Sequence, residues 1–122
     1  MLLEIDKELR DLELNFANIQ QEYPEIARKA AQSRFAYDMS YAQAVYDIAH
    51  RAVADGKKPP TVAVQDAEAT LMVAEQMEAA RIAEAELDIA QKTIKSLESR
   101  LSSTQSRVKL SILEKQITNY QT

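Results

Sequence analysis

A carboxylate and an imidazole stand three residues apart in this chain, at Asp47 and His50. On a helix this spacing puts both side chains on one face, and helical di-metal bundles bind their ions with such pairs. Those sites also need a second pair and two further carboxylates. Because the chain has a single histidine, the set cannot be completed. We expect a surface histidine near a loop, with no metal bound.

A second group of carboxylates follows later in the chain, at Glu75, Glu78, Glu84, Glu86 and Asp88. Glu75 and Glu78 have the Glu-x-x-Glu spacing of all-helical phosphohydrolases. The second motif of those enzymes fails here, because Ala85 stands three residues before Asp88. Charge runs on helices usually form a solvated face, which is what we expect here.

Other catalytic arrangements are missing from the sequence. It has no cysteine and one histidine, so neither a cysteine nucleophile nor a Ser/His/Asp set can be argued. It also has no glycine-rich loop to hold a phosphate. We therefore predict that the chain is not an enzyme and uses no cofactor.

Basic residues offer a different chemistry, the binding of nucleic-acid phosphates. The candidates are Arg51, Lys57, Lys58, Arg100, Arg107 and Lys109. Tyr37 and Tyr41, one turn apart, are candidates for stacking on bases. The net charge of −4 and the pI of about 5.0 oppose general nucleic-acid binding. The alternative is that the basic residues pair with acidic residues of the same chain and that the tyrosines pack in the core.

The elements that carry these residues are predicted to be long helices. One glycine and three prolines in 122 residues leave too few turn formers for a sheet. Apolar spacings of three and four predict helices over residues 2–23, 25–54 and 62–120. Pro24 predicts a kink or break between the first two. Gly56 and Thr61 predict a turn over residues 55–61, with Gly56 after one helix and Thr61 capping the next.

Each predicted helix has an expected buried seam. In residues 2–23 the seam is Leu2, Ile5, Leu9, Leu12, Phe16, Ile19 and Tyr23. In residues 25–54 it is Phe35, Met39, Ala42, Tyr46, Ala49 and Val53. In residues 62–120 it is Val73, Met77, Ala80, Ala83, Leu87, Ala90, Ile94, Leu97, Leu101, Thr104 and Val108. Near residue 105 the phase slips, and Leu110, Leu113, Ile117 and Tyr120 continue, either as a stutter or as a surface for another partner.

Charge blocks predict how the helices pair. Residues 1–25 and 65–91 are acidic, whereas residues 26–54 and 92–122 are basic. Folding the chain at Pro59-Pro60 lays each acidic block on a basic one, with Ala54 near Gln65, Glu25 near Ile94 and Met1 near Thr118. The sequence therefore predicts a single all-α domain over residues 1–122, a long antiparallel helical hairpin or coiled coil.

A two-helix hairpin buries little of its surface, so we expect a homo-oligomer. The candidate second interface is Tyr41, Ile48, Leu71, Ile82, Ile89 and Ile112. The N-terminus has no basic and apolar leader, and no stretch approaches the roughly 20 apolar residues of a membrane span. We expect a soluble, cytoplasmic protein with no membrane partner.

The layout resembles the UvsY-type phage recombination mediators. The similarity lies in a helix with spaced tyrosines, a short basic turn and the stretch from Leu97 to Lys109, which reads LESRLSSTQSRVK. It implies an oligomeric protein in the cytoplasm of a phage-infected bacterium that binds single-stranded DNA and assists recombinase loading. On this resemblance Lys57, Lys58, Arg107 and Lys109 would contact DNA. The alternative is a protein-binding hairpin with no DNA role, either an inhibitor of a host defence complex or a coiled-coil scaffold.

Overall fold

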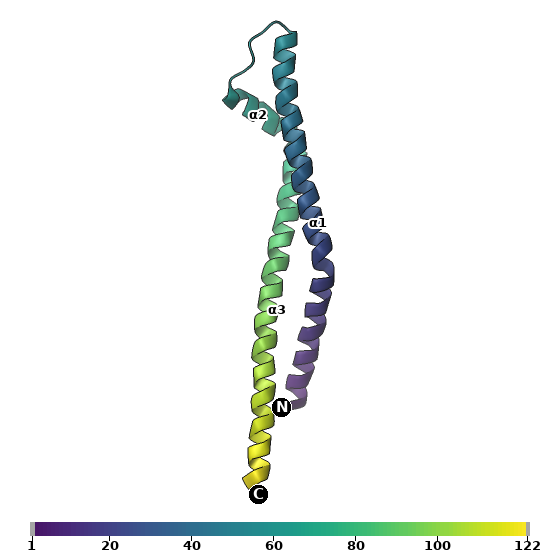
Figure 1. Ribbon diagram of the computed structural model, residues 1–122, viewed down its shortest axis with the longest axis vertical. Helices are drawn as coiled ribbons and strands as arrows, with labels where there is room; N and C mark the ends of the chain where they lie inside the picture. Colours follow the sequence, from purple (N-terminus) through teal and green to yellow (C-terminus); the bar gives the residue numbers. More distant parts are fainter. Residues whose placement is uncertain (1, 122) are drawn as a thin grey trace. The chain divides into compact units, whose positions relative to one another are not determined.

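The computed structural model describes residues 2–121, which form three helices (Figure 1). The first, α1, spans Leu2–Ala54; α2 spans Val62–Met72; and α3 spans Ala74–Gln121. The two long helices pack antiparallel, and the short α2 lies between them in the chain. The prediction of an all-α, hairpin-like fold is confirmed.

The chain divides into two compact units, and each contains a stretch of both long helices. The first unit comprises residues 2–24 and 88–121, and the second comprises residues 25–87. Pro24 is the last residue of the first unit on α1.

Of the kink or break expected at Pro24, the break is wrong, because α1 runs through this residue as one helix. A proline inside a helix removes one backbone hydrogen bond and costs about 3 kcal/mol. Packing on either side offsets that cost: Leu12 before the proline and Ala30 after it are both buried. Helices in proteins are stabilised mainly by such packing.

The predicted end of α1 and start of α2 are confirmed. Gly56 has a φ of 72°, and its amide donates to the carbonyl of Val53 at 3.0 Å, while the Lys57 amide donates to Ala52 at 2.9 Å. This pair of bonds is the Schellman motif, in which glycine accepts the left-handed conformation. After the turn, the Thr61 hydroxyl caps α2 by accepting from the Val64 amide at 3.4 Å.

The expected uninterrupted helix over residues 62–120 is instead two helices separated at Val73. This residue has φ −108° and ψ 21°, outside the helical range. Its side chain is buried against Ala44, Ile48 and Ala69. No glycine or proline marks the interruption, and the burial of Val73 is the feature that accompanies it.

The first unit has a narrow core along the predicted seam. Ile5 and Leu12 of α1 are buried, as are Ala90, Leu97 and Thr104 of α3. The other expected positions are half-buried, namely Leu9, Phe16, Ile19, Tyr23, Ile94, Leu101 and Val108. The seam is thus confirmed except at Leu2, which is 37% exposed.

In the second unit the expected buried face of α1 is wrong. The core cluster consists of Ala44, Ile48, Ala69 and Val73, with Tyr37, Tyr41 and Val45 packed against it. The large residues assigned to the seam, Phe35, Met39, Tyr46 and Val53, are 57–67% exposed. Tyr41 and Ile48, which were assigned to a second interface, belong to this core. On α3 the expected seam residues Ala80 and Ala83 are buried.

Ion pairs confirm that acidic blocks pair with basic ones. In the first unit Arg107 lies 3.3 Å from Glu8. In the second, Lys29 lies 3.7 Å from Glu86 and Arg34 lies 3.6 Å from Glu84. The predicted alignment is displaced by up to one helical turn, since it would put Glu8 opposite Ser111. The predicted pairing of Met1 with Thr118 lies outside the described residues.

The end of α3 carries the second phase of the sequence pattern. Val108 and Ser111 are half-buried, whereas Leu110, Leu113, Ile117 and Tyr120 are 49–95% exposed. Within the first unit α3 extends past the first turn of α1 (Figure 1). None of the helices over residues 2–121 is both long enough and apolar enough to cross a bilayer.

Candidate functional site

An apolar stripe with regular spacing runs along α1 in the second unit. It consists of Phe35, Met39, Ala42, Tyr46, Ala49 and Val53, and is called the outer stripe below. The four large members are exposed by 67% (Phe35), 57% (Met39), 63% (Tyr46) and 60% (Val53). Alternating spacings of four and three are the pattern of a helix that packs along another helix.

The outer stripe lies across the helix from the core. Ala42 and Tyr46 are each two residues from Ala44, a separation of about 160° around the axis at 3.6 residues per turn. Because Ala44 faces the core cluster, Tyr46 faces away from it. In this unit α1 therefore has two apolar faces, one packed against its own chain and one exposed.

Polar features border the stripe on one side. The His50 ring stacks on the Tyr46 ring, with centroids 5.7 Å apart and planes 7° from parallel. A shallow hollow next to Met39 is lined by Gln43, Asp47, Met72 and Gln76. In it the Gln43 amide donates to Asp47 at 2.8 Å.

Three carboxylates of the acidic group form ion pairs with basic side chains. Glu84 pairs with Arg34, Glu86 with Lys29 and Asp88 with Lys92. Hydrogen bonding to Asp88 raises the pKa of Lys92. Within residues 2–121 no three His, Asp or Glu side chains are close enough together to hold a metal ion.

Three of the predicted phosphate contacts lie at one end of the second unit. Arg51 is in the last turn of α1, and Lys57 and Lys58 follow in the turn. All three are exposed, and none forms an ion pair within 4.0 Å in the described part of the chain.

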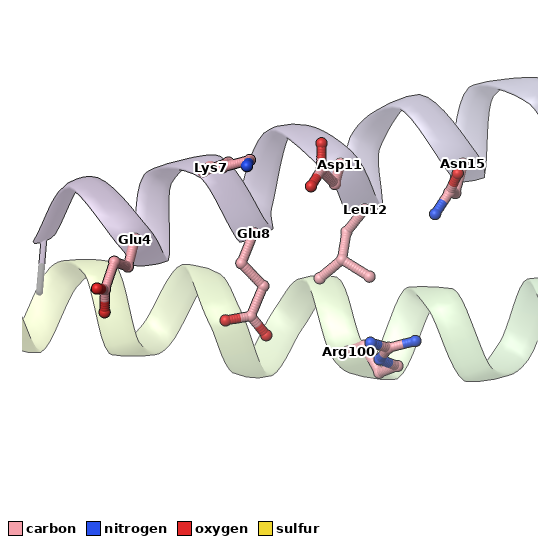
Figure 2. Close-up of a pocket in the computed structure, with 7 residues that line it drawn as sticks. All are labelled: Glu4, Lys7, Glu8, Asp11, Leu12, Asn15 and Arg100. Carbon is pink, nitrogen blue, oxygen red and sulfur yellow. The ribbon is translucent and has the colours of Figure 1, made fainter.

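The other three lie on α3 in the first unit, where acidic residues of α1 are close. Arg100 lines a groove together with Glu4, Glu8 and Asp11. Figure 2 shows Glu8 and Leu12 extending from α1 toward α3, where Arg100 lies. Arg107 donates to Glu8 at 3.3 Å, and Lys109 is exposed. The six candidates are thus split between two units, and at least Arg107 pairs within its own chain.

The two tyrosines considered for base stacking pack against the core. Their rings lie 6.2 Å apart, and the Arg34 guanidinium lies 5.5 Å from the centre of the Tyr37 ring. The Tyr41 hydroxyl donates to the Asp66 carboxylate, which connects α1 to α2. This hydrogen bond is the largest of several effects that raise the pKa of Tyr41.

Sequence reasoning found the residues of the outer stripe but assigned them to the buried face. The correct face is indicated by the spacing of the seam in residues 2–23. From Tyr23 its spacing continues through Pro24 to Ile26, Ala30, Ser33, Tyr37, Ser40 and Ala44, all of which are buried or half-buried. Because this face carries small and hydroxyl-bearing residues, its apolar pattern is weak. Phe35 and Met39 give the opposite face the stronger apolar pattern.

Comparisons with models of protein families, with curated proteins and with solved structures found no match for this chain. The resemblance to UvsY-type mediators stays a prediction from the sequence.

Proposed function

We propose that this chain is a non-enzymatic assembly protein that binds a helix of another chain along the outer stripe. The observation that supports this is the exposed heptad pattern at Phe35, Met39, Tyr46 and Val53. Single exposed apolar residues are normal on protein surfaces, but a contiguous apolar patch marks an interaction site. The partner surface that fits a straight apolar stripe is the apolar face of an amphipathic helix.

The rest of the second unit supports a docking role. The outer stripe lies on a helix whose opposite face is fixed by Ala44 and Ile48 in the core. A side chain presented from a packed helix is held more precisely than one on a loop. Binding there needs little ordering of the stripe backbone, so less of the interaction free energy is lost on association.

Photo-crosslinking tests this proposal. A benzophenone amino acid at position 46 should give covalent adducts with a helical segment of a partner chain, identified by mass spectrometry of the adduct. Position 14 on α1 is the matched control, because Leu14 is also a large exposed residue, at 61%, and lies outside the outer stripe. Adducts from position 46 alone support the proposal, and their absence at position 46 contradicts it.

Single-stranded DNA binding is a second proposal, favoured by Arg51, Lys57 and Lys58. All three side chains are exposed and form no ion pair within the described residues. They are therefore available to bind phosphates. An oligomer would repeat them along a strand, in keeping with the recombinase-loading role that the sequence resemblance implies.

Counterion release gives the test of DNA binding. A fluorescent single strand should bind at low salt and dissociate steeply as salt rises. Lys57→Ala with Lys58→Ala should weaken binding, whereas Lys7→Ala with Lys115→Ala removes the same charge elsewhere and should not. Equal weakening by both double variants would show that the effect comes from net charge and not from these positions. Absence of binding at low salt would contradict the DNA proposal, and only the protein-binding proposal would stand.

A further inference from the structure

We infer that the partner helix on the outer stripe is α1 of a second copy of this chain, running antiparallel about a twofold axis near residue 44. This inference rests on the proposed function and names its partner. It is carried by the order of large and small residues within the stripe, by the limits of the stripe and by its area.

The residue order makes the stripe complementary to itself when one copy is reversed. Pairing each position with the one equally far on the other side of residue 44 puts Phe35 against Val53, Met39 against Ala49 and Tyr46 against Ala42. Phe35, Met39 and Tyr46 then each meet a smaller side chain, as interdigitated layers require. A twofold interface uses the same patch on both copies, so every such contact is made twice.

Parallel pairing of two copies gives a worse fit. It sets Phe35, Met39 and Tyr46 each against itself and leaves Ala42 opposite Ala42. Such a seam alternates large pairs with gaps, and unfilled gaps in a packed interface are destabilising. The antiparallel orientation is therefore the one that this residue order favours.

The limits of the stripe fix where the two copies overlap. Continuing the spacing toward the N-terminus brings Gln32 and Arg28 to the seam, and Arg28 is already paired with Glu25 at 2.6 Å. Toward the C-terminus α1 ends at Ala54. The apolar segment is about 27 Å long at 1.5 Å per residue, and full overlap of two such segments is centred on Ala44.

The flanks of the stripe allow two copies of an acidic chain to meet. The positions beside the seam are Ala36, Asp38, Gln43, Val45, His50 and Ala52. Asp38 is the one carboxylate among them, and it lies 3.4 Å from Arg34 of its own chain. Because none of the other flanking positions carries a carboxylate, no two carboxylates are opposed in the antiparallel alignment.

The area is sufficient for a specific dimer. Phe35 and Tyr46, exposed by 67% and 63%, contribute roughly 100–150 Å² each, since aromatic side chains bury about 150–250 Å² in full. The smaller Met39 and Val53 contribute less. With the alanines and flanking residues this approaches about 600 Å² per copy, or about 1,200 Å² in total, the lower end of the range for specific interfaces.

Sedimentation of the full chain tests the inference. The wild type should show a concentration-dependent monomer–dimer equilibrium. Tyr46→Glu should be monomeric at every concentration while keeping its helical circular dichroism, because Tyr46 is 63% exposed within the chain. The matched control Leu14→Glu, at a position of α1 that is 61% exposed and outside the outer stripe, should dimerise like the wild type. A dimer that survives Tyr46→Glu, or a wild type that is monomeric throughout, overturns the inference.

Disulfide trapping tests the orientation, and the chain offers a clean background because it has no cysteine. A mixture of Met39→Cys and Ala49→Cys chains should form a mixed disulfide dimer faster than either variant alone. Ser96→Cys on α3 is the control and should stay unlinked. Efficient linking of Met39→Cys with itself would indicate the parallel arrangement and overturn the antiparallel one.

The two levels of the proposal fail separately. A monomeric wild type whose position 46 still crosslinks to another protein removes the second copy and keeps the helix-binding function. Loss of every adduct at position 46 removes both.

Discussion

The guanidinium of Arg107 lies 3.3 Å from the carboxylate of Glu8, joining α3 to α1 within the first unit. The two side chains are 52% and 42% exposed, so water screens their attraction. The pair contributes little to the free energy of unfolding, but it favours one alignment of two helices that could otherwise slide by a turn. It also gives Arg107 a role that does not require DNA.

Exchanging the two charges tests this role. Glu8→Arg and Arg107→Glu should each lower the free energy of unfolding, by at most about 1 kcal/mol at low salt, because each sets like charges together. The double variant should recover most of the loss, since the pair is restored in reverse. Denaturant titration of the wild type, the two single variants and the double variant, at low and high salt, measures these changes in the free energy of unfolding as a double-mutant cycle. Additive losses in the double variant would show that the two residues do not interact.

Truncating the core of the first unit should cost far more. Leu12 is 3% exposed, and Leu12→Ala should lower the free energy of unfolding by about 2–4 kcal/mol through lost burial and the cavity left behind. Leu14, two positions along the same helix, is 61% exposed and is the matched control. Leu14→Ala should change the free energy by less than about 0.5 kcal/mol. Similar losses from both variants would contradict the assigned face.

Replacing the proline inside α1 should stabilise the chain. Pro24→Ala restores a backbone donor in a helix that already runs through this position. The gain of about 3 kcal/mol in the helix is reduced by about 1 kcal/mol, because alanine gives the unfolded chain more freedom. We expect a net rise of about 2 kcal/mol in the free energy of unfolding, measured by denaturant titration at fixed protein concentration. Unchanged or lower stability would mean that the native backbone depends on the proline.

The fold could be read from the sequence where one physical signal dominates. Gly56 and Thr61 have special roles at helix ends, so the turn was predicted to the residue. The seam of α3 was predicted from Val73 to Val108 because its apolar spacing is regular and no other face competes. Charge blocks gave the pairing of the helices but not the exact alignment, since exposed ion pairs have a reach of about one turn.

The wrong predictions share a physical cause. At each of these positions tertiary packing outweighs the local conformational preference of the residue. Pro24 has the strongest local signal against a helix, and packing on both sides overrides it. Val73 has no breaking signal, yet the helix is interrupted there where its side chain is buried. In residues 25–54 the larger apolar residues were predicted to be buried. Instead Ala44 and Ile48 are buried in the core, and Phe35 and Tyr46 are exposed. Two apolar faces on one helix cannot be ranked by hydrophobicity alone.

The hydrogen bond from Tyr41 to Asp66 predicts a pH dependence at the junction of α1 and α2. The bond needs the protonated phenol, and it is the main cause of a Tyr41 pKa above the ordinary value of 10.0. A raised pKa in the folded state means that the protonated form is favoured by folding. Its stabilising contribution is therefore complete below about pH 10 and is lost as pH rises through the raised pKa.

Tyrosinate absorbance and unfolding followed over alkaline pH test this prediction. Tyr41→Phe should lower the free energy of unfolding below pH 10 and remove part of its alkaline decline, together with one tyrosinate absorbance step above pH 10. Asp66→Asn should keep the step but move it toward the ordinary tyrosine pKa, because the charged acceptor is gone. Tyr120→Phe is the control for the loss of one tyrosine, since Tyr120 is 95% exposed and its replacement should leave the free energy of unfolding below pH 10 unchanged. Equal free energies of unfolding of the wild type and Tyr41→Phe below pH 10 would mean that Tyr41 makes no stabilising hydrogen bond to Asp66 in solution.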